Sequence, residues 1–73
     1  MADLLAQRVA ERIHLQMRRQ RATQDALAKH LGISQAGISR RLTGQVEFTV
    51  GELAAVAQFL GVSVHDLLPE AVA

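Results

Sequence analysis

The sequence predicts an all-α fold, with five helices in a single domain. Its 73 residues suffice for one small domain, and 49% of them are hydrophobic while 21% are charged, so the chain can bury a core. No run of strand length alternates apolar and polar residues. Four times, however, a Ser or Thr stands directly after an apolar residue and four positions before another, which is typical of a capped helix start. These predicted caps are Thr23, Ser34, Thr49 and Ser63.

A long amphipathic first helix is predicted over residues 3–21. Apolar side chains recur there at every fourth position, which places them on one face of a helix. They are Leu5, Val9, Ile13 and Met17. Arginines crowd the last turn, where the negative end of the helix dipole stabilises cations.

The four caps begin the remaining helices, and a glycine or a proline ends each of them. The stop residues are Gly32, Gly44, Gly61 and Pro69. The predicted helices are 24–30, 35–42, 50–60 and 64–68. The last two also carry an acidic residue three positions after the cap, Glu52 and Asp66, as in a capping box.

The segments 24–30 and 35–42 form a predicted helix-turn-helix. Two helices that cross closely need a small side chain at the crossing, a glycine in the tight turn and apolar residues that fix the angle. Ala28 and Gly32 meet the first two demands. The apolar residues are Leu27, Leu31, Ile33 and Ile38.

The stretch "TQDALAKHLGISQAGISRRLTG", followed by "TVGELAAVAQFLGVSVHDLL", resembles the helix-turn-helix domains of Cro and phage repressors, also called XRE-like or lambda repressor-like. The resemblance covers nearly the whole chain, from Ile13 to Leu68. It implies a five-helix domain that binds operator DNA as a dimer, with the third helix in the major groove. The residues that it assigns are Gln24 for a phosphate and Gln35, Ala36, Ser39 and Arg40 for the reading of bases.

Helix geometry independently supports most of this reading face. At about 100° per residue, Ile38 and Leu42 lie on one side of the third helix and can be buried. The opposite arc holds Ala36, Ser39, Arg40 and Thr43. Gln35 lies nearer the buried side by angle, but as the first residue of the helix it can extend from the end. Glutamine can bond an adenine edge, arginine can bond guanine, and a small alanine can touch a thymine methyl group.

The chain departs from the family pattern at three places. Arg41 stands where the family often has an apolar residue and Leu42 where it often has glutamate or an aromatic residue, so we expect the core packing to shift by one residue and Arg41 to contact a phosphate. Phe48 stands where proline is common. The loop "GQVEF" lacks the usual Lys and Arg, so its DNA contact is expected to come from Gln45 and backbone N–H groups. Fewer cations there predict weaker nonspecific affinity.

Charge is distributed unevenly although the net charge is only +1. Residues 1–41 hold all eight basic side chains and three acidic ones, a net charge of +5. Residues 42–73 hold four acidic side chains and no basic one, a net charge of −4. Such polarity is typical of a protein that presents one face to phosphates. The alternative is a solvated, charged first helix with no such role.

Other classes of function find little support in the sequence. The chain has no cysteine, which excludes disulfides and thiolate zinc sites. The longest apolar run, 53–57, is too short to span a membrane. His14, His30 and His65 fall on three different predicted helices, so no metal site is expected. Ser34 and Ser63 are explained as caps, and we expect neither catalysis nor a cofactor.

The sequence thus predicts a sequence-specific regulator of transcription that binds double-stranded DNA, of the phage or prophage repressor type. One recognition helix covers few base pairs, so a homodimer on a palindromic operator is expected, with the apolar segment 62–72 as the dimer contact. We expect a cytoplasmic location in a bacterial or phage-infected cell. The alternative is a protein-interaction module, antitoxin-like or an adaptor, on the same scaffold. Salt separates the two, because DNA binding weakens steeply as salt rises.

Overall fold

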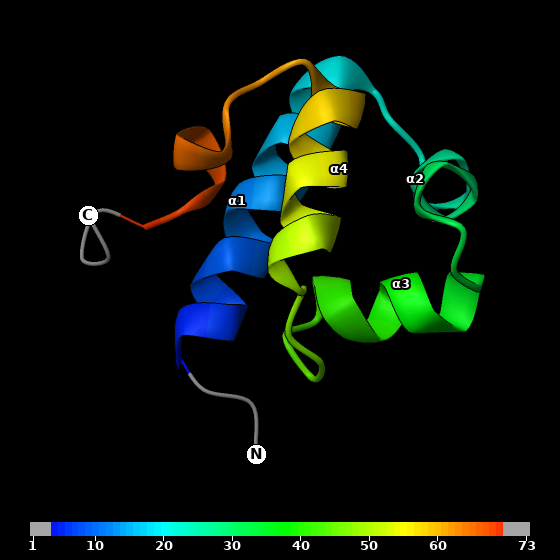
Figure 1. Ribbon diagram of the computed structural model, residues 1–73, viewed down its shortest axis with the longest axis horizontal. Coiled ribbons are helices and arrows are strands. Elements are labelled where there is room, and N and C mark those ends of the chain that lie inside the picture. The colour runs from blue at the N-terminus through cyan, green and yellow to red at the C-terminus, as the bar shows by residue number, and fades with distance from the viewer. Residues whose placement is uncertain (1–3, 70–73) are drawn as a thin grey trace.

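The computed structural model describes residues 4–69 and consists of four α-helices followed by one turn of 3-10 helix (Figure 1). The elements are α1 Leu4–Gln20, α2 Gln24–Leu31, α3 Gln35–Leu42, α4 Val50–Leu60 and the 3-10 helix η1 Val64–Leu67. No strand occurs within residues 4–69. The all-α prediction is confirmed, and α3 and α4 have the bounds that were predicted for them. The α2 helix continues one residue further than predicted, to Leu31.

The prediction of a fifth α-helix over 64–68 is wrong, because η1 is a four-residue 3-10 helix. Leu68 leaves the helical region, with φ −98° and ψ 139°. Proline disfavours the α conformation in the residue before it, so Pro69 forces Leu68 into an extended conformation. Between the cap at Ser63 and Pro69 there is room for only one turn.

The first helix ends at Gln20 rather than at residue 21, and residue 3 lies outside the described range. Arg21 has a left-handed backbone, with φ 55°. This conformation lets the Ala22 N–H donate to the Met17 carbonyl at 2.9 Å, as in a Schellman ending. Glycine usually occupies such a position, so the arginine carries a conformational cost.

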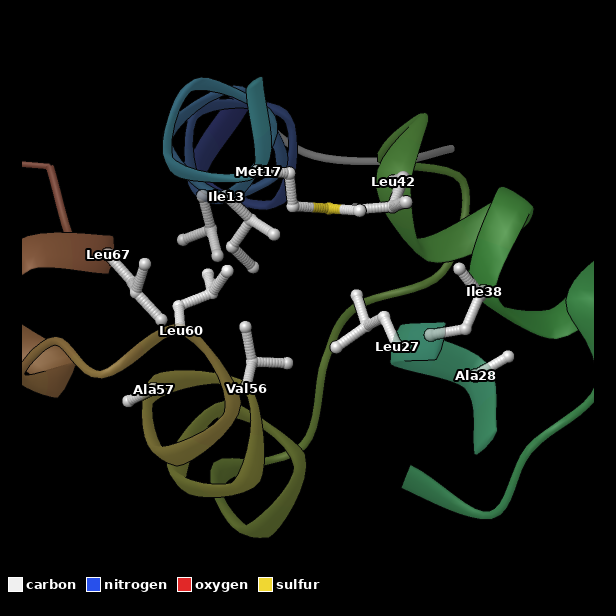
Figure 2. Close-up of a cluster of buried hydrophobic side chains, with 11 residues drawn as sticks. Ile13, Met17, Leu27, Ala28, Ile38, Leu42, Val56, Ala57, Leu60 and Leu67 are labelled. Carbon is white, nitrogen blue, oxygen red and sulfur yellow. The ribbon is translucent and has the colours of Figure 1, made fainter. Parts of the chain in front are cut away.

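Every element contributes one side chain with no exposed surface to the core. These five residues are Ile13, Leu27, Ile38, Val56 and Leu67, from α1, α2, α3, α4 and η1 in that order. Figure 2 shows them converging, with Met17 of α1 extending toward Leu42 of α3. Leu42 of α3 is buried in the core, whereas the neighbouring Arg41 is only partly buried.

The helices are arranged around α1 and α4, which contact each other (Figure 1). In this view α2 and α3 lie on one side of that pair and η1 lies on the other. The α2 helix contacts both α3 and α4, whereas η1 contacts α1 and α4. As a result α3 lies at an edge of the molecule with one long face uncovered. Across residues 4–69, no helix has both the length and the apolar composition needed to cross a membrane.

Candidate nucleic-acid interface

Two capped helices and a glycine turn orient α3. The Ala26 N–H donates to Thr23 Oγ1 at 3.1 Å, and the Gly37 N–H donates to Ser34 Oγ at 3.0 Å. Gly32, between the helices, adopts φ 71° and lets the Ile33 N–H reach the Ala28 carbonyl at 3.1 Å. The predicted caps at Thr23 and Ser34 and the predicted glycine turn at Gly32 are therefore confirmed, and together they determine the direction in which α3 leaves the turn.

The outward arc of α3 has the composition that was predicted for a reading face. Its exposed residues are Gln35, Ala36, Ser39, Arg40 and Thr43. On the opposite side Gly37, Ile38 and Leu42 are buried. The structure thus brings five of the predicted site residues together on one exposed surface. Their role in binding stays a prediction.

Gln35 is held by a residue that sequence reasoning missed. Its amide Nε2–H donates to Asp25 Oδ1 of α2 at 2.9 Å. The other carboxylate oxygen of Asp25 lies 3.2 Å from the Lys29 ammonium group, and the two side chains form an exposed ion pair. Ten positions separate Asp25 from Gln35, and only the crossing of α2 over α3 brings them together, so no local sequence signal could have shown this contact.

The loop after α3 is fixed by one carbonyl group. The Arg40 carbonyl accepts hydrogen bonds from Thr43 Oγ1 at 3.0 Å and from the N–H groups of Gln45 and Val46 at 2.9 and 3.3 Å. Gly44, at φ 80°, packs on α1 so closely that an added Cβ would lie 2.8 Å from Gln7 Cγ. Gln45 is exposed just beyond the reading face. Gln24, which the family resemblance assigns to a phosphate, is exposed at the first position of α2.

Arg41 does not lie with the other predicted site residues. Its guanidinium turns toward α4, where Nε–H donates to Glu52 Oε1 at 3.0 Å and Nη2–H donates to Glu52 Oε2 at 3.2 Å. Nη1–H donates to the Gly37 carbonyl at 3.0 Å. Only 19% of the Arg41 side chain and 20% of the Glu52 side chain are exposed. The structure therefore places Arg41 between α3 and α4.

Glu52 also closes the N-terminus of α4. Its Oε1 accepts the Thr49 N–H and its own N–H donates to Thr49 Oγ1, both at 3.0 Å, which confirms the predicted capping box. Burial acts to raise the pKa of Glu52, but the hydrogen bond from Arg41, the Thr49 N–H and the charge of Arg41 outweigh burial and lower it. The carboxylate is therefore ionised at neutral pH.

The sequence profile of the helix-turn-helix domain matches residues 4–70. The chain belongs to the helix-turn-helix domain family. Proteins with this domain are typically DNA-binding regulators, and the match includes the whole of α1 to η1. No curated protein and no solved structure matches the chain significantly.

Two histidines of this helix-turn-helix domain contact neighbouring elements. His14 Nε2–H donates to the Leu42 carbonyl at 3.0 Å, which links α1 to the end of α3. The ring of His30 lies 5.3 Å from that of Phe59, centroid to centroid. His65 is exposed on η1. Within residues 4–69 no group of three His, Cys, Asp or Glu side chains is placed to hold a metal ion.

An apolar pocket of about 130 Å³ lies between the start of α1, the α3–α4 loop, the start of α4 and Leu68, which follows η1. Sequence reasoning missed it. Its lining includes Leu5, which is 43% exposed although it belongs to the apolar stripe predicted for the first helix. The full lining is Leu5, Ala6, Val9, Glu47, Phe48, Leu53 and Leu68.

Proposed function

We propose that this helix-turn-helix domain binds double-stranded DNA sequence-specifically, with α3 in the major groove, and regulates transcription as a repressor of the phage or prophage type. The observation that carries the proposal is the exposed arc of α3, which combines a glutamine, two small residues, an arginine and a threonine on a helix with an uncovered face. An α-helix fits into the major groove of DNA, where each base pair presents a different pattern of hydrogen-bond donors and acceptors.

The reading residues differ in what they can recognise. Gln35 can bond the N6 and N7 edge of adenine with its amide, and Arg40 can bond guanine O6 and N7. Ala36 is small enough for close approach and can contact a thymine methyl group. Ser39 can accept or donate to either kind of base.

Phosphate contacts would come from the edges of the motif. Gln24 at the start of α2 and Gln45 after α3 flank the reading face, and both are exposed. Neither side chain carries a charge, so we expect a low affinity for nonspecific DNA. Contacts with bases would then contribute a larger share of the binding free energy. We expect no catalytic activity and no cofactor.

Binding as a homodimer would supply the length of site that one helix cannot. Two copies related by a two-fold axis would place their α3 helices on half-sites about one turn of DNA apart. The segment predicted for the contact, 62–72, is described only as far as residue 69. Of its described residues, Leu67 is buried in the core and Leu68 is half-buried, packing against the core and lining the pocket.

The second candidate function is protein binding on the same scaffold, as an antitoxin-like or adaptor module. The apolar pocket, whose lining includes the partly exposed Leu5, is the observation in its favour. Contact through such a surface would hardly respond to salt, whereas DNA binding would weaken steeply between low and physiological salt.

Selection from a pool of random duplexes with the purified protein, at physiological salt, tests the proposal. We expect enrichment of a two-fold symmetric site that contains adenine and guanine where Gln35 and Arg40 reach. Enrichment of an asymmetric site would refute the proposed homodimer but would still support sequence-specific DNA binding. If no sequence is enriched, the proposal fails and the helix-turn-helix is a scaffold for another partner.

A further inference from the structure

The backbones of α3 and α4 do not approach each other. Among the described helices, no Cα atom of α3 lies within 8 Å of a Cα atom of α4, although α3 packs on both α1 and α2. The α3 helix therefore packs directly on α1 and α2, whereas only side chains connect it to α4. Ile38 and Leu42 anchor α3 in the core, so the polar contact between Arg41 and Glu52 adds to that packing in fixing its orientation.

One ion pair crosses the space between α3 and α4. Arg41 uses three donors, two on the Glu52 carboxylate and one on the Gly37 carbonyl a turn earlier on its own helix. A bidentate arginine–carboxylate pair fixes orientation as well as distance, and with about a fifth of each side chain exposed it is shielded from solvent. The guanidinium is thereby locked against α3.

The acidic partner is equally constrained. The Thr49 N–H donates to the same Glu52 Oε1 that receives Arg41 Nε–H, so the carboxylate is part of the first turn of α4. Gly37 contributes by its lack of a side chain, because an added Cβ would lie 3.3 Å from Arg41 Nη1. The side chains of Arg41 and Glu52, which connect α3 to the N-terminal cap of α4, are therefore both held by hydrogen bonds.

We infer that Arg41 is a positioning residue, and that its pairing with Glu52 sets the angle at which α3 presents its reading face to DNA. The inference rests on the proposed function for its DNA part. It assigns to Arg41 a role different from the phosphate contact that the sequence predicted, because a phosphate would have to displace the carboxylate from a bidentate pair.

Neutralisation of Glu52 distinguishes the two roles by sign. Glu52→Gln keeps an oxygen for the Thr49 N–H but removes the ion pair. If Arg41 positions α3, affinity for the selected site falls roughly five- to tenfold, within the usual range for coupled contacts, and affinity for random DNA does not fall. If Arg41 contacts a phosphate, loss of the carboxylate frees it and affinity for both DNAs rises. Glu11→Gln is the matched control, because it removes one acid from an exposed site on α1.

Arg41→Lys supplies a second comparison. Lysine binds phosphate as a point charge but cannot reproduce the planar fork. Positioning predicts that Arg41→Lys loses as much specific affinity as Glu52→Gln and leaves the slope of log affinity against log salt unchanged. A phosphate contact predicts nearly full affinity for Arg41→Lys and a slope smaller by about 0.9 for Arg41→Gln. All variants are compared at a temperature where circular dichroism shows them folded.

Amide hydrogen exchange of the DNA-free protein tests positioning without any DNA. Exchange at residues 40–46 should become faster in Glu52→Gln and Arg41→Lys, and should not change in Glu11→Gln. Unchanged exchange in the first two variants overturns the inference, whatever the DNA result. If the wild-type protein selects no DNA sequence, the proposed function fails, and faster exchange in those variants would still support the positioning role.

Discussion

At the scale of single residues, the candidate interface divides into side chains that face outward and side chains that support them. Gln35 belongs to both groups, since it is exposed and yet bonded to Asp25. This bond uses one amide proton and leaves the carbonyl oxygen and the second proton for a base. A reading residue whose rotamer is already fixed loses less entropy on binding.

Replacement of Gln35 by alanine tests its reading role. We expect a loss of roughly 1 to 3 kcal/mol in binding to the selected site and little change on random DNA, because a base contact carries sequence information and a phosphate contact does not. Fluorescence anisotropy with both duplexes measures this. Gln58→Ala, at an exposed glutamine of α4, is the matched control. Equal losses on both duplexes would remove Gln35 from the reading face.

The ion pair of Glu52 predicts a dependence of stability on pH. Because the pKa of Glu52 is lowered below its ordinary value of 4.5 in the folded state, its contribution is fully present above 4.5 and is lost as pH falls through the folded pKa. Glu52→Gln should therefore destabilise the protein at neutral pH and have no effect at a pH well below 4.5. Urea unfolding of both proteins at the two pH values measures this. An equal difference at both would show that the charge contributes nothing.

At the scale of elements, helix ends follow local chemistry and place α3. Caps at Thr23, Ser34 and Thr49 each satisfy an N–H of the first turn. The left-handed residues that end α1 and α2 differ, however, because Arg21 stands at φ 55° and Gly32 at φ 71°. The same backbone region therefore costs free energy at one end and little at the other.

Substitutions at these two ends should have opposite effects on stability. Gly32→Ala should lower the free energy of unfolding by about 1 kcal/mol from backbone strain alone, since an added Cβ meets nothing within 4 Å. Arg21→Gly should raise it by about 0.5 to 1 kcal/mol, reduced by the greater freedom of glycine in the unfolded chain. Thermal or urea unfolding measures both. A destabilised Arg21→Gly would mean that the side chain contributes more than the backbone costs.

At the scale of the whole molecule, stability depends on one small core to which every element contributes. A domain of this size has little stability in reserve. Each of the five completely buried side chains touches the shared cluster, so the loss of any one affects the packing of several elements. The reading face therefore depends on residues that cannot touch DNA.

Truncation of the core side chain of α3 tests this dependence. Ile38→Ala should lower the free energy of unfolding by roughly 2 to 5 kcal/mol, enough to unfold a substantial fraction of the protein. Val50→Ala, at a side chain that is 85% exposed, should change it by less than about 0.5 kcal/mol. Chemical denaturation followed by circular dichroism compares them. A small effect of Ile38→Ala would mean that the neighbouring side chains fill the space.

Much of the fold could be predicted from sequence because its signals are local. The capping residue, the apolar residues on either side of it and the glycine that ends the helix lie within a few helical turns of each other. The predicted bounds of α3 and α4 are therefore the observed ones. Helix periodicity predicted the outward arc of α3 except for Gln35, which the family resemblance and its place at the helix end assigned. The last element was predicted as the wrong kind of helix, since the effect of Pro69 on a single turn outweighed the cap signal.

By itself, the sequence determined the all-α class, the helix-turn-helix and the exposed residues of α3, since each depends on spacing along the chain. Only the tertiary structure decided which partners those residues have. Asp25 meets Gln35, and Glu52 takes Arg41 away from the reading face, across separations of ten and eleven positions. Such contacts depend on how helices cross, and the crossing is set by the packing of the whole core rather than by any short stretch.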